Sequence, residues 1–128
     1  MHLPVLVLMI LCILPITCAW ASGYFRHQQL GVVDNKNPRA QNAQLTGAGA
    51  RAVAAQANAW EALAVYAAAL LALNVSQVPV EQYATLTLGV LAARVVHAVS
   101  YIANQDIVRS LAFLAGYGLC IYFFVMAL

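Results

Sequence analysis

Charged residues are scarce in this sequence, and their scarcity decides its class. Only six lysines and arginines and four acidic residues occur among 128 residues, so 8% are charged, against roughly 25% in a soluble domain. Hydrophobic residues make up 64% of the chain, and the mean hydropathy is +0.81. A net charge of +2 is also too small for a nucleic-acid-binding surface. The composition therefore predicts an integral membrane protein that does not bind nucleic acid.

Metal and redox motifs are missing as well. The three histidines lie in different segments, so no metal-ligand spacing exists and we expect no metal site. No C-x-x-C motif occurs, and the cysteines fall within apolar stretches, where a thiol usually acts as a small buried hydrophobic group. The cysteines are Cys12, Cys18 and Cys120. These absences argue against a redox function of the protein's own thiols.

Four long apolar stretches are present, and each is long enough to cross a bilayer. They predict membrane spans at about 3–21, 51–74, 80–103 and 107–128, with a polar loop at 22–45. Four spans use most of the chain, so no separate soluble domain fits. The predicted fold class is an all-α integral membrane protein, a four-transmembrane-helix up-down bundle that forms one domain over the whole chain.

The first apolar stretch has a rival interpretation as a secretory signal peptide. Ala19, Trp20 and Ala21 resemble a small-x-small cleavage site. A signal peptide begins with a positive region, however, and only Met1 and His2 precede this apolar run. The missing positive region favours a retained first helix.

Basic residues cluster near two of the three loops, which predicts the orientation. Four flank the first loop, two approach the third, and the second loop and both termini carry none. They are Arg26, Lys36, Arg39, Arg51, Arg94 and Arg109. Because cytoplasmic loops carry an excess of lysine and arginine, the first and third loops should face the cytoplasm and both termini should face away from it.

The second span carries polar residues on one face. Arg51, Asn58 and Glu61 are separated by seven and three residues, which places them on a single helical stripe. A carboxylate within the hydrocarbon is costly and needs a partner. Counting 1.5 Å per residue along both helices puts Arg94 of the third span at the depth of Glu61. We therefore predict that Glu61 pairs with Arg94, either within a subunit or across a subunit boundary.

The third and fourth spans add further polar groups to the same leaflet. Arg94, His97 and Tyr101 share one helical face, and Arg109 and Ser110 open the fourth span. Such groups can serve as hydrogen-bonding contacts between helices that fix the register of the bundle. Contributions from three separate spans exceed what register requires, and they favour a site for an anionic ligand, whose carboxylates guanidinium groups can bind.

These residues also match a known family in order and spacing. The second span follows the signature E-R-x-x-R-A-H-x-N-x-x-E in part, and the third and fourth spans follow R-x-x-H-x-x-x-Y and R-x-L-x-F-x-x-G-Y-G. The stretch 34–39 is similar to the loop of bacterial members. The matching positions in the second span are Arg51, Gln56, Asn58 and Glu61. The chain thus resembles the MAPEG family, which comprises microsomal glutathione transferases with prostaglandin E and leukotriene synthases.

The resemblance implies a homotrimer in a bacterial inner membrane. Glutathione would bind as a cosubstrate between subunits, and a small lipophilic substrate would arrive from the lipid bilayer for transfer or peroxide reduction. The resemblance gives Arg109 and Ser110 the catalytic role of activating the thiol. It assigns glutathione binding to Arg51, Asn58, Glu61, Arg94, His97 and Tyr101.

Other functions remain open beside this one. Ala54 stands where the family signature has its second arginine, so a non-catalytic membrane protein that keeps the family fold is one alternative. Another is a small proton-coupled exporter in which Glu61 exchanges protons. A site for lipophilic cations would be weakened by Arg94, whereas an anion site needs it.

Overall fold

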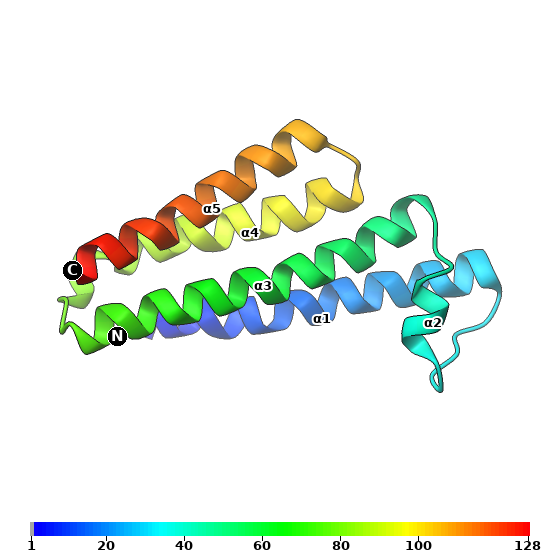
Figure 1. Cartoon of the computed structure of the whole chain (residues 1–128), viewed down its shortest axis with the longest axis horizontal. Coiled ribbons are helices and arrows are strands. Elements are labelled where there is room, and N and C mark those ends of the chain that lie inside the picture. The colour runs from blue at the N-terminus through cyan, green and yellow to red at the C-terminus, as the bar shows by residue number, and fades with distance from the viewer. Residues whose placement is uncertain (1) are drawn as a thin grey trace.

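The computed structural model describes residues 2–128, which form a bundle of helices (Figure 1). Four helices are long and apolar enough to cross a membrane, and they run alternately up and down in two hairpins, α1 with α3 and α4 with α5. This architecture confirms the predicted four-helix integral membrane fold. The elements are α1 (His2–Leu30), α2 (Pro38–Asn42), α3 (Gly47–Val75), the 3-10 turn η1 (Val80–Gln82), α4 (Ala84–Ile102) and α5 (Asp106–Ala127).

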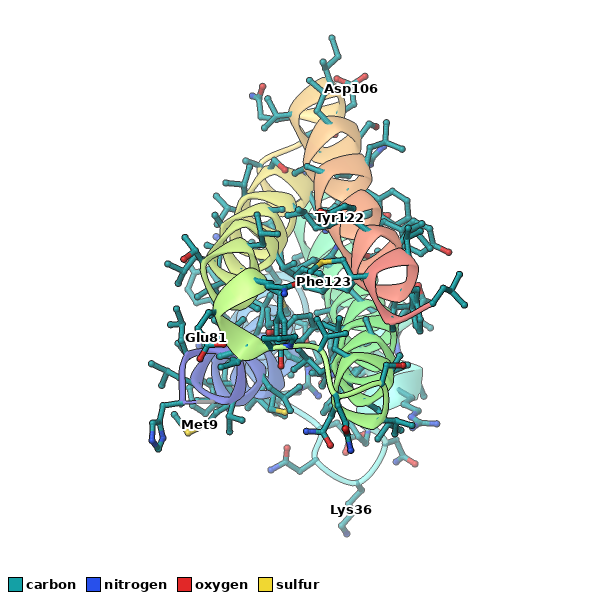
Figure 2. All side chains as sticks on the ribbon, turned by 90° about the vertical axis from the view of Figure 1, so that its left-hand side faces the viewer. Met9, Lys36, Glu81, Asp106, Tyr122 and Phe123 are labelled. Atoms are coloured by element: carbon teal, nitrogen blue, oxygen red, sulfur yellow. The ribbon has the colours of Figure 1, made fainter. Side chains whose placement is uncertain are left out.

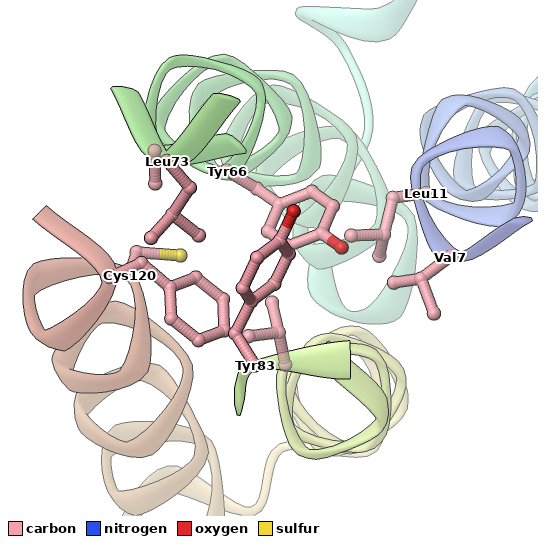
Figure 3. Packing of buried hydrophobic residues seen from close by; sticks show 9 residues of the cluster. Val7, Leu11, Tyr66, Leu73, Tyr83 and Cys120 are labelled. Atoms are coloured by element: carbon pink, nitrogen blue, oxygen red, sulfur yellow. The ribbon is translucent and has the colours of Figure 1, made fainter. Parts of the chain in front are cut away.

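The end of the bundle that holds both termini contains the main apolar core (Figures 1 and 3). All four long helices contribute to it, and Figure 2 shows Phe123 directed between them, whereas Met9 and Lys36 point outward. The Tyr66 hydroxyl donates a 3.2 Å hydrogen bond to the carbonyl of Pro4 and so ties α3 to α1. The buried residues of this core are Val7, Leu11, Tyr66, Ala69, Leu73, Tyr83, Val90, Cys120 and Phe123.

The opposite end, which holds α2 and the α4–α5 turn, buries fewer large apolar side chains. Its buried apolar cluster consists only of Cys18, Ala55 and Ala98. The α4–α5 hairpin diverges from α1 and α3 toward this end (Figure 1). We call it the loop end, and the other the terminal end.

The prediction of a loop over 22–45 is wrong in extent. Helix α1 continues to Leu30 and stops at Gly31, whose φ of +80° suits glycine, and a further short helix, α2, forms within the stretch. Polar composition indicates where the helix leaves the hydrocarbon core of the membrane, but it does not indicate where the helix ends. The third span also begins later than predicted, at Ala84, because the residues after Pro79 form the turn η1.

Two glutamine side chains fix the path between α1 and α3. The Gln29 amide donates to the carbonyl of Thr46 and accepts from its N–H, both at 3.0 Å, and so holds the start of α3 against the end of α1. Gln41 is buried; its Nε2 donates to the Val32 carbonyl, and its Oε1 accepts from Arg26. These bonds replace the solvation that the loop backbone loses on folding.

Asp34 organises the turn before α2. Its Oδ1 accepts hydrogen bonds from the backbone N–H groups of Lys36 at 2.8 Å and Asn37 at 3.1 Å. Because these donors stabilise the ionised form, they lower the pKa of the Asp34 carboxyl from its ordinary value. The turn is therefore held by hydrogen bonds to the ionised carboxylate of Asp34.

Candidate functional site

Arg94 lies at the centre of the polar groups that α3 and α4 bring together. Its side chain is 4% exposed and His97, one turn later on α4, is 2% exposed. The Nη2 group of Arg94 donates to Oδ1 of Asn58 on α3 and lies 3.3 Å from Nδ1 of His97. Within residues 2–128 the buried Nε of Arg94 has no hydrogen-bond partner. A buried guanidinium with an unused donor is suited to an anionic or carbonyl-bearing ligand.

Gly116 allows α5 to approach Arg94 closely. A Cβ at this position would lie 3.3 Å from both Cβ of Ala93 and Cδ of Arg94, which is tighter than ordinary van der Waals contact. Ala112, one turn earlier, is also buried. This small-residue surface brings α5 against α4 and places its side chains around the arginine.

The predicted Glu61–Arg94 ion pair does not form within this chain: among the described residues, no carboxylate lies within ion-pair distance of Arg94, and Glu61 is exposed. The rise per residue predicts the depth of a side chain along its helix. It does not predict which residue of the polar stripe on α3 faces α4. Glu61 lies three residues after Asn58, which turns it by about 60° around the helix. Asn58 takes the position facing Arg94 instead.

Most of the predicted site residues line a hollow of about 390 Å³ between α3, α4 and α5. The guanidinium of Arg109 stacks over the Tyr101 ring, 4.7 Å from its centroid. This cation–π contact fixes Arg109 at the mouth of the hollow. The lining consists of Asn58, His97, Tyr101, Arg109, Ser110, Phe113 and Leu114.

A second hollow of about 130 Å³ adjoins the first and shares Asn58 and Phe113 with it. Its polar lining comes from Asn58, Glu61 and Arg94, and the rest is apolar and runs toward Cys120. The two hollows together contain seven of the eight predicted site residues. We refer to them as the α3–α4–α5 site.

Arg51 is the predicted site residue that the structure leaves out. It lines neither hollow, and its Nε donates a 3.0 Å hydrogen bond to the carbonyl of Ile102. A cation at the last carbonyls of a helix is electrostatically favourable. Within the single chain, Arg51 therefore holds the end of α4, next to Tyr101.

Three residues of α5 belong to the lining although the sequence did not place them in the predicted site. Phe113, Tyr117 and Cys120 all line the 130 Å³ hollow. The rings of Phe113 and Tyr117 are stacked, with centroids 5.7 Å apart, and Phe113 lies 6.2 Å from His97. Their spacing of four and three residues marks a common helical face and could have indicated this role.

The site combines cations and hydrogen-bonding groups with an apolar wall. Arg94 is buried and Arg109 is partly exposed, while the aromatic rings of α5 form one side. No group of three His, Cys, Asp or Glu side chains in the part of the chain that the structure describes could hold a metal ion. The arrangement suits an anionic molecule with an apolar partner beside it.

Comparison with known proteins places this arrangement in context. The model of the MAPEG family matches residues 3–128, essentially the whole chain. No curated protein and no solved structure matches it.

Proposed function

Because the chain belongs to the MAPEG family, we propose that it is a glutathione-dependent transferase or peroxidase that acts on lipophilic substrates. One observation carries the proposal: two cations, an amide, a hydroxyl and an aromatic wall converge in adjoining hollows between α3, α4 and α5. Family membership supplies the ligand class, and the site's charge agrees with it. Glutathione is anionic and carries amide groups, so it needs both guanidinium and amide partners.

Arg94 and Asn58 are the proposed binding residues for the tripeptide. The Nε of Arg94 is an unused donor among the described residues, and the bond from Nη2 to Asn58 holds the guanidinium in place. Glu61 and Tyr101 lie on the walls of the two hollows and complete the set. A ligand carboxylate or carbonyl would satisfy the buried donor that the protein itself leaves unused.

Arg109 and Ser110 are the proposed activating residues. They lie in the first turns of α5, where unsatisfied backbone N–H groups make the helix terminus electropositive. A thiol reacts as its thiolate, and a nearby cation and hydroxyl stabilise that form. Because Tyr101 holds the guanidinium by ring stacking, Arg109 is positioned before any ligand arrives.

We further propose that three copies assemble in a bacterial inner membrane, with both termini away from the cytoplasm. The basic residues of the polar connections lie at the loop end, which agrees with a cytoplasmic position for that end. Glu61 is exposed in the single chain although it lies on an apolar helix. A neighbouring subunit would remove this carboxylate from lipid, which costs less when it is partnered.

Thiolate absorbance provides the test. The purified protein, titrated with glutathione at neutral pH, should give a saturable ultraviolet difference signal. Arg109→Ala should lose the signal and keep binding measured by calorimetry, because a lone cation acts on the ionised thiol more than on the tripeptide. Lys36→Ala, which removes an exposed cation far from the site, should behave as wild type. No signal and no saturable binding at about 1 mM glutathione, equivalent to about 4 kcal/mol, would refute the enzyme proposal.

Restoring the arginine of the family signature should strengthen binding. Ala54 is half-buried and stands on α3 one turn before Asn58. We expect Ala54→Arg to bind glutathione several-fold more tightly than wild type, with Ala54→Gln as the uncharged control. Equal affinities in calorimetry would show that this position does not face the ligand.

A further inference from the structure

His97 is a buried polar side chain of the α3–α4–α5 site to which the proposed chemistry gives no role. It is 2% exposed and lines the hollow of about 390 Å³. On α4 it lies about one turn after Arg94 and one turn before Tyr101, the ring over which the guanidinium of Arg109 is stacked. Buried polar groups are almost always bonded, so the contacts of His97 indicate what it does.

The proton arrangement on His97 follows from its neighbour. Nδ1 of the imidazole lies 3.3 Å from Nη2 of Arg94, and a guanidinium group carries donors only. Nδ1 therefore accepts the hydrogen bond, which leaves the ring proton on Nε2 and the imidazole neutral. The other hydrogen of Nη2 is donated to Oδ1 of Asn58 on α3. Two acceptors on two helices thus use both hydrogens of Nη2 and set the plane of the guanidinium.

The ring of His97 contacts the other half of the site. It packs edge-to-face with Tyr101, with centroids 5.5 Å apart and an interplanar angle of 72°, and lies 6.2 Å from the ring of Phe113 on α5. This geometry is favourable because the positive edge of one ring meets the negative face of the other. The Tyr101 ring in turn carries the guanidinium of Arg109, 4.7 Å from its centroid. A displaced His97 ring would therefore displace Tyr101 and the cation stacked on it.

We propose that His97 is a positioning residue that joins the binding half of the site to the activating half, an inference that rests on the proposed function. Its Nδ1 holds Arg94 in the orientation that presents to a ligand the Nε unused within residues 2–128. Its ring holds Tyr101 and, through it, Arg109. Neither effect requires contact between His97 and the ligand. Different atoms of one side chain carry the two effects, so substitutions can separate them.

One variant removes the acceptor and keeps a ring. His97→Phe leaves an aromatic group beside Tyr101 but no acceptor for Arg94. Glutathione should then bind about tenfold more weakly in calorimetry, as expected when one hydrogen bond to a charged group is lost. The thiolate absorbance per bound glutathione should stay unchanged, because the contact with Tyr101 is kept.

The opposite variant keeps an acceptor and removes the ring. The side-chain carbonyl in His97→Asn lies near the position of Nδ1, so the affinity for glutathione should stay within about threefold of wild type. The thiolate absorbance per bound glutathione should fall at least about threefold, because nothing then packs against the edge of Tyr101. Val99→Ala, at an exposed position of the same helix, should match wild type in both measurements.

A measurement without ligand tests the geometry separately. Nitrogen NMR of the histidine-labelled protein in detergent at neutral pH should show His97 with an unprotonated Nδ1 and a protonated Nε2. The exposed residues His2 and His27 are assigned by their loss in His2→Gln and His27→Gln. A proton on Nδ1 of His97 would overturn the proposal.

The pattern across the variants decides the rest. Circular dichroism and oligomeric mass unchanged from wild type would show that the fold is intact. If His97→Phe and His97→Asn lose affinity and thiolate signal to the same extent, or lose neither, the positioning role is overturned although wild type still binds glutathione. A wild type that binds no glutathione would instead refute the proposed function itself.

Discussion

The two ends of the bundle differ in the side chains that lie between the helices. At the terminal end, large apolar residues from all four long helices fill the space between them, and Ser76 ties α3 to α5 through a 2.7 Å bond to the carbonyl of Ala127. At the loop end, the buried apolar cluster is small and the hairpins diverge (Figure 1). Hollows lined by charged groups take the place of packing there.

The difference indicates that stability and chemistry are separated along the bundle axis. A close-packed core leaves little room for a ligand, and the 130 Å³ hollow meets that core only at Val90 and Cys120. Buried guanidinium groups contribute little net stability. Placing them at opposite ends lets one end hold the helices while the other presents polar groups. Substitutions at the two ends should therefore have different effects.

The largest expected effect is at Phe123, which is fully buried at the terminal end with its ring 6.1 Å from that of Tyr83. Phe123→Ala should destabilise the protein by about 3–5 kcal/mol, because it removes a large buried ring and leaves a cavity. Phe113→Ala at the loop end, where the ring is 38% exposed, should cost less than half as much. Chemical unfolding in detergent micelles measures both, and equal losses would contradict the separation of the two ends.

The next effect concerns the hydrogen bond that Arg94 makes to Asn58 within the single chain. Asn58→Ala and Arg94→Gln should be non-additive by about 1.5–3 kcal/mol, as for a hydrogen bond to a charged group. Glu61→Gln combined with Arg94→Gln should be additive within about 0.5 kcal/mol. The same unfolding assay completes both cycles, and strong coupling to Glu61 would mean that a carboxylate reaches Arg94 in the assembled protein.

A smaller effect is expected at Arg51. Arg51→Gln removes the bond to the Ile102 carbonyl and should cost about 1 kcal/mol. Backbone hydrogen exchange should accelerate in the α4–α5 turn and stay unchanged at the terminal end. Lost glutathione binding with unchanged exchange in the turn would instead make Arg51 a ligand residue.

The smallest effect is a pH response confined to the connection before α2. The pKa of Asp34 is lowered in the folded protein, so its contribution is present above the unfolded pKa of about 3.9 and is lost as the pH falls through the folded value. Hydrogen exchange at Lys36 and Asn37, corrected for intrinsic rates, should lose protection only below that value. In Asp34→Asn the response should disappear, and a response that persists there would point to another group.

Hydropathy and residue spacing predicted much of this molecule because both are properties of a single segment and do not depend on how the helices are arranged in space. Apolar length predicts the four spans, and the periodicity of α4 correctly puts Arg94 and His97 on its buried face. The family match over residues 3–128 agrees with the resemblance inferred from the motifs.

The features that the sequence left undetermined depend on geometry that one helix does not contain. The partner of Arg94 depends on the rotation of α3, and the role of Arg51 depends on where α4 ends. The end of α1 at Leu30 is held by hydrogen bonds from the side chains of Gln29 and Gln41. Both donate to backbone carbonyls that lie several residues away along the chain. Side chains that bind backbone groups leave no periodic pattern.

The unequal length of the two hairpins affects how molecules can reach the α3–α4–α5 site. Helices α1 and α3 have 29 residues each, whereas α4 has 19 and α5 has 22, so the helices of the first hairpin are about 10–15 Å longer. Arg109 and Tyr101, which line the larger hollow, belong to the shorter hairpin, and α1 and α3 extend past the α4–α5 turn (Figure 1). A water-soluble molecule that reaches these residues from beyond the loop end therefore passes beside the projecting ends of α1 and α3.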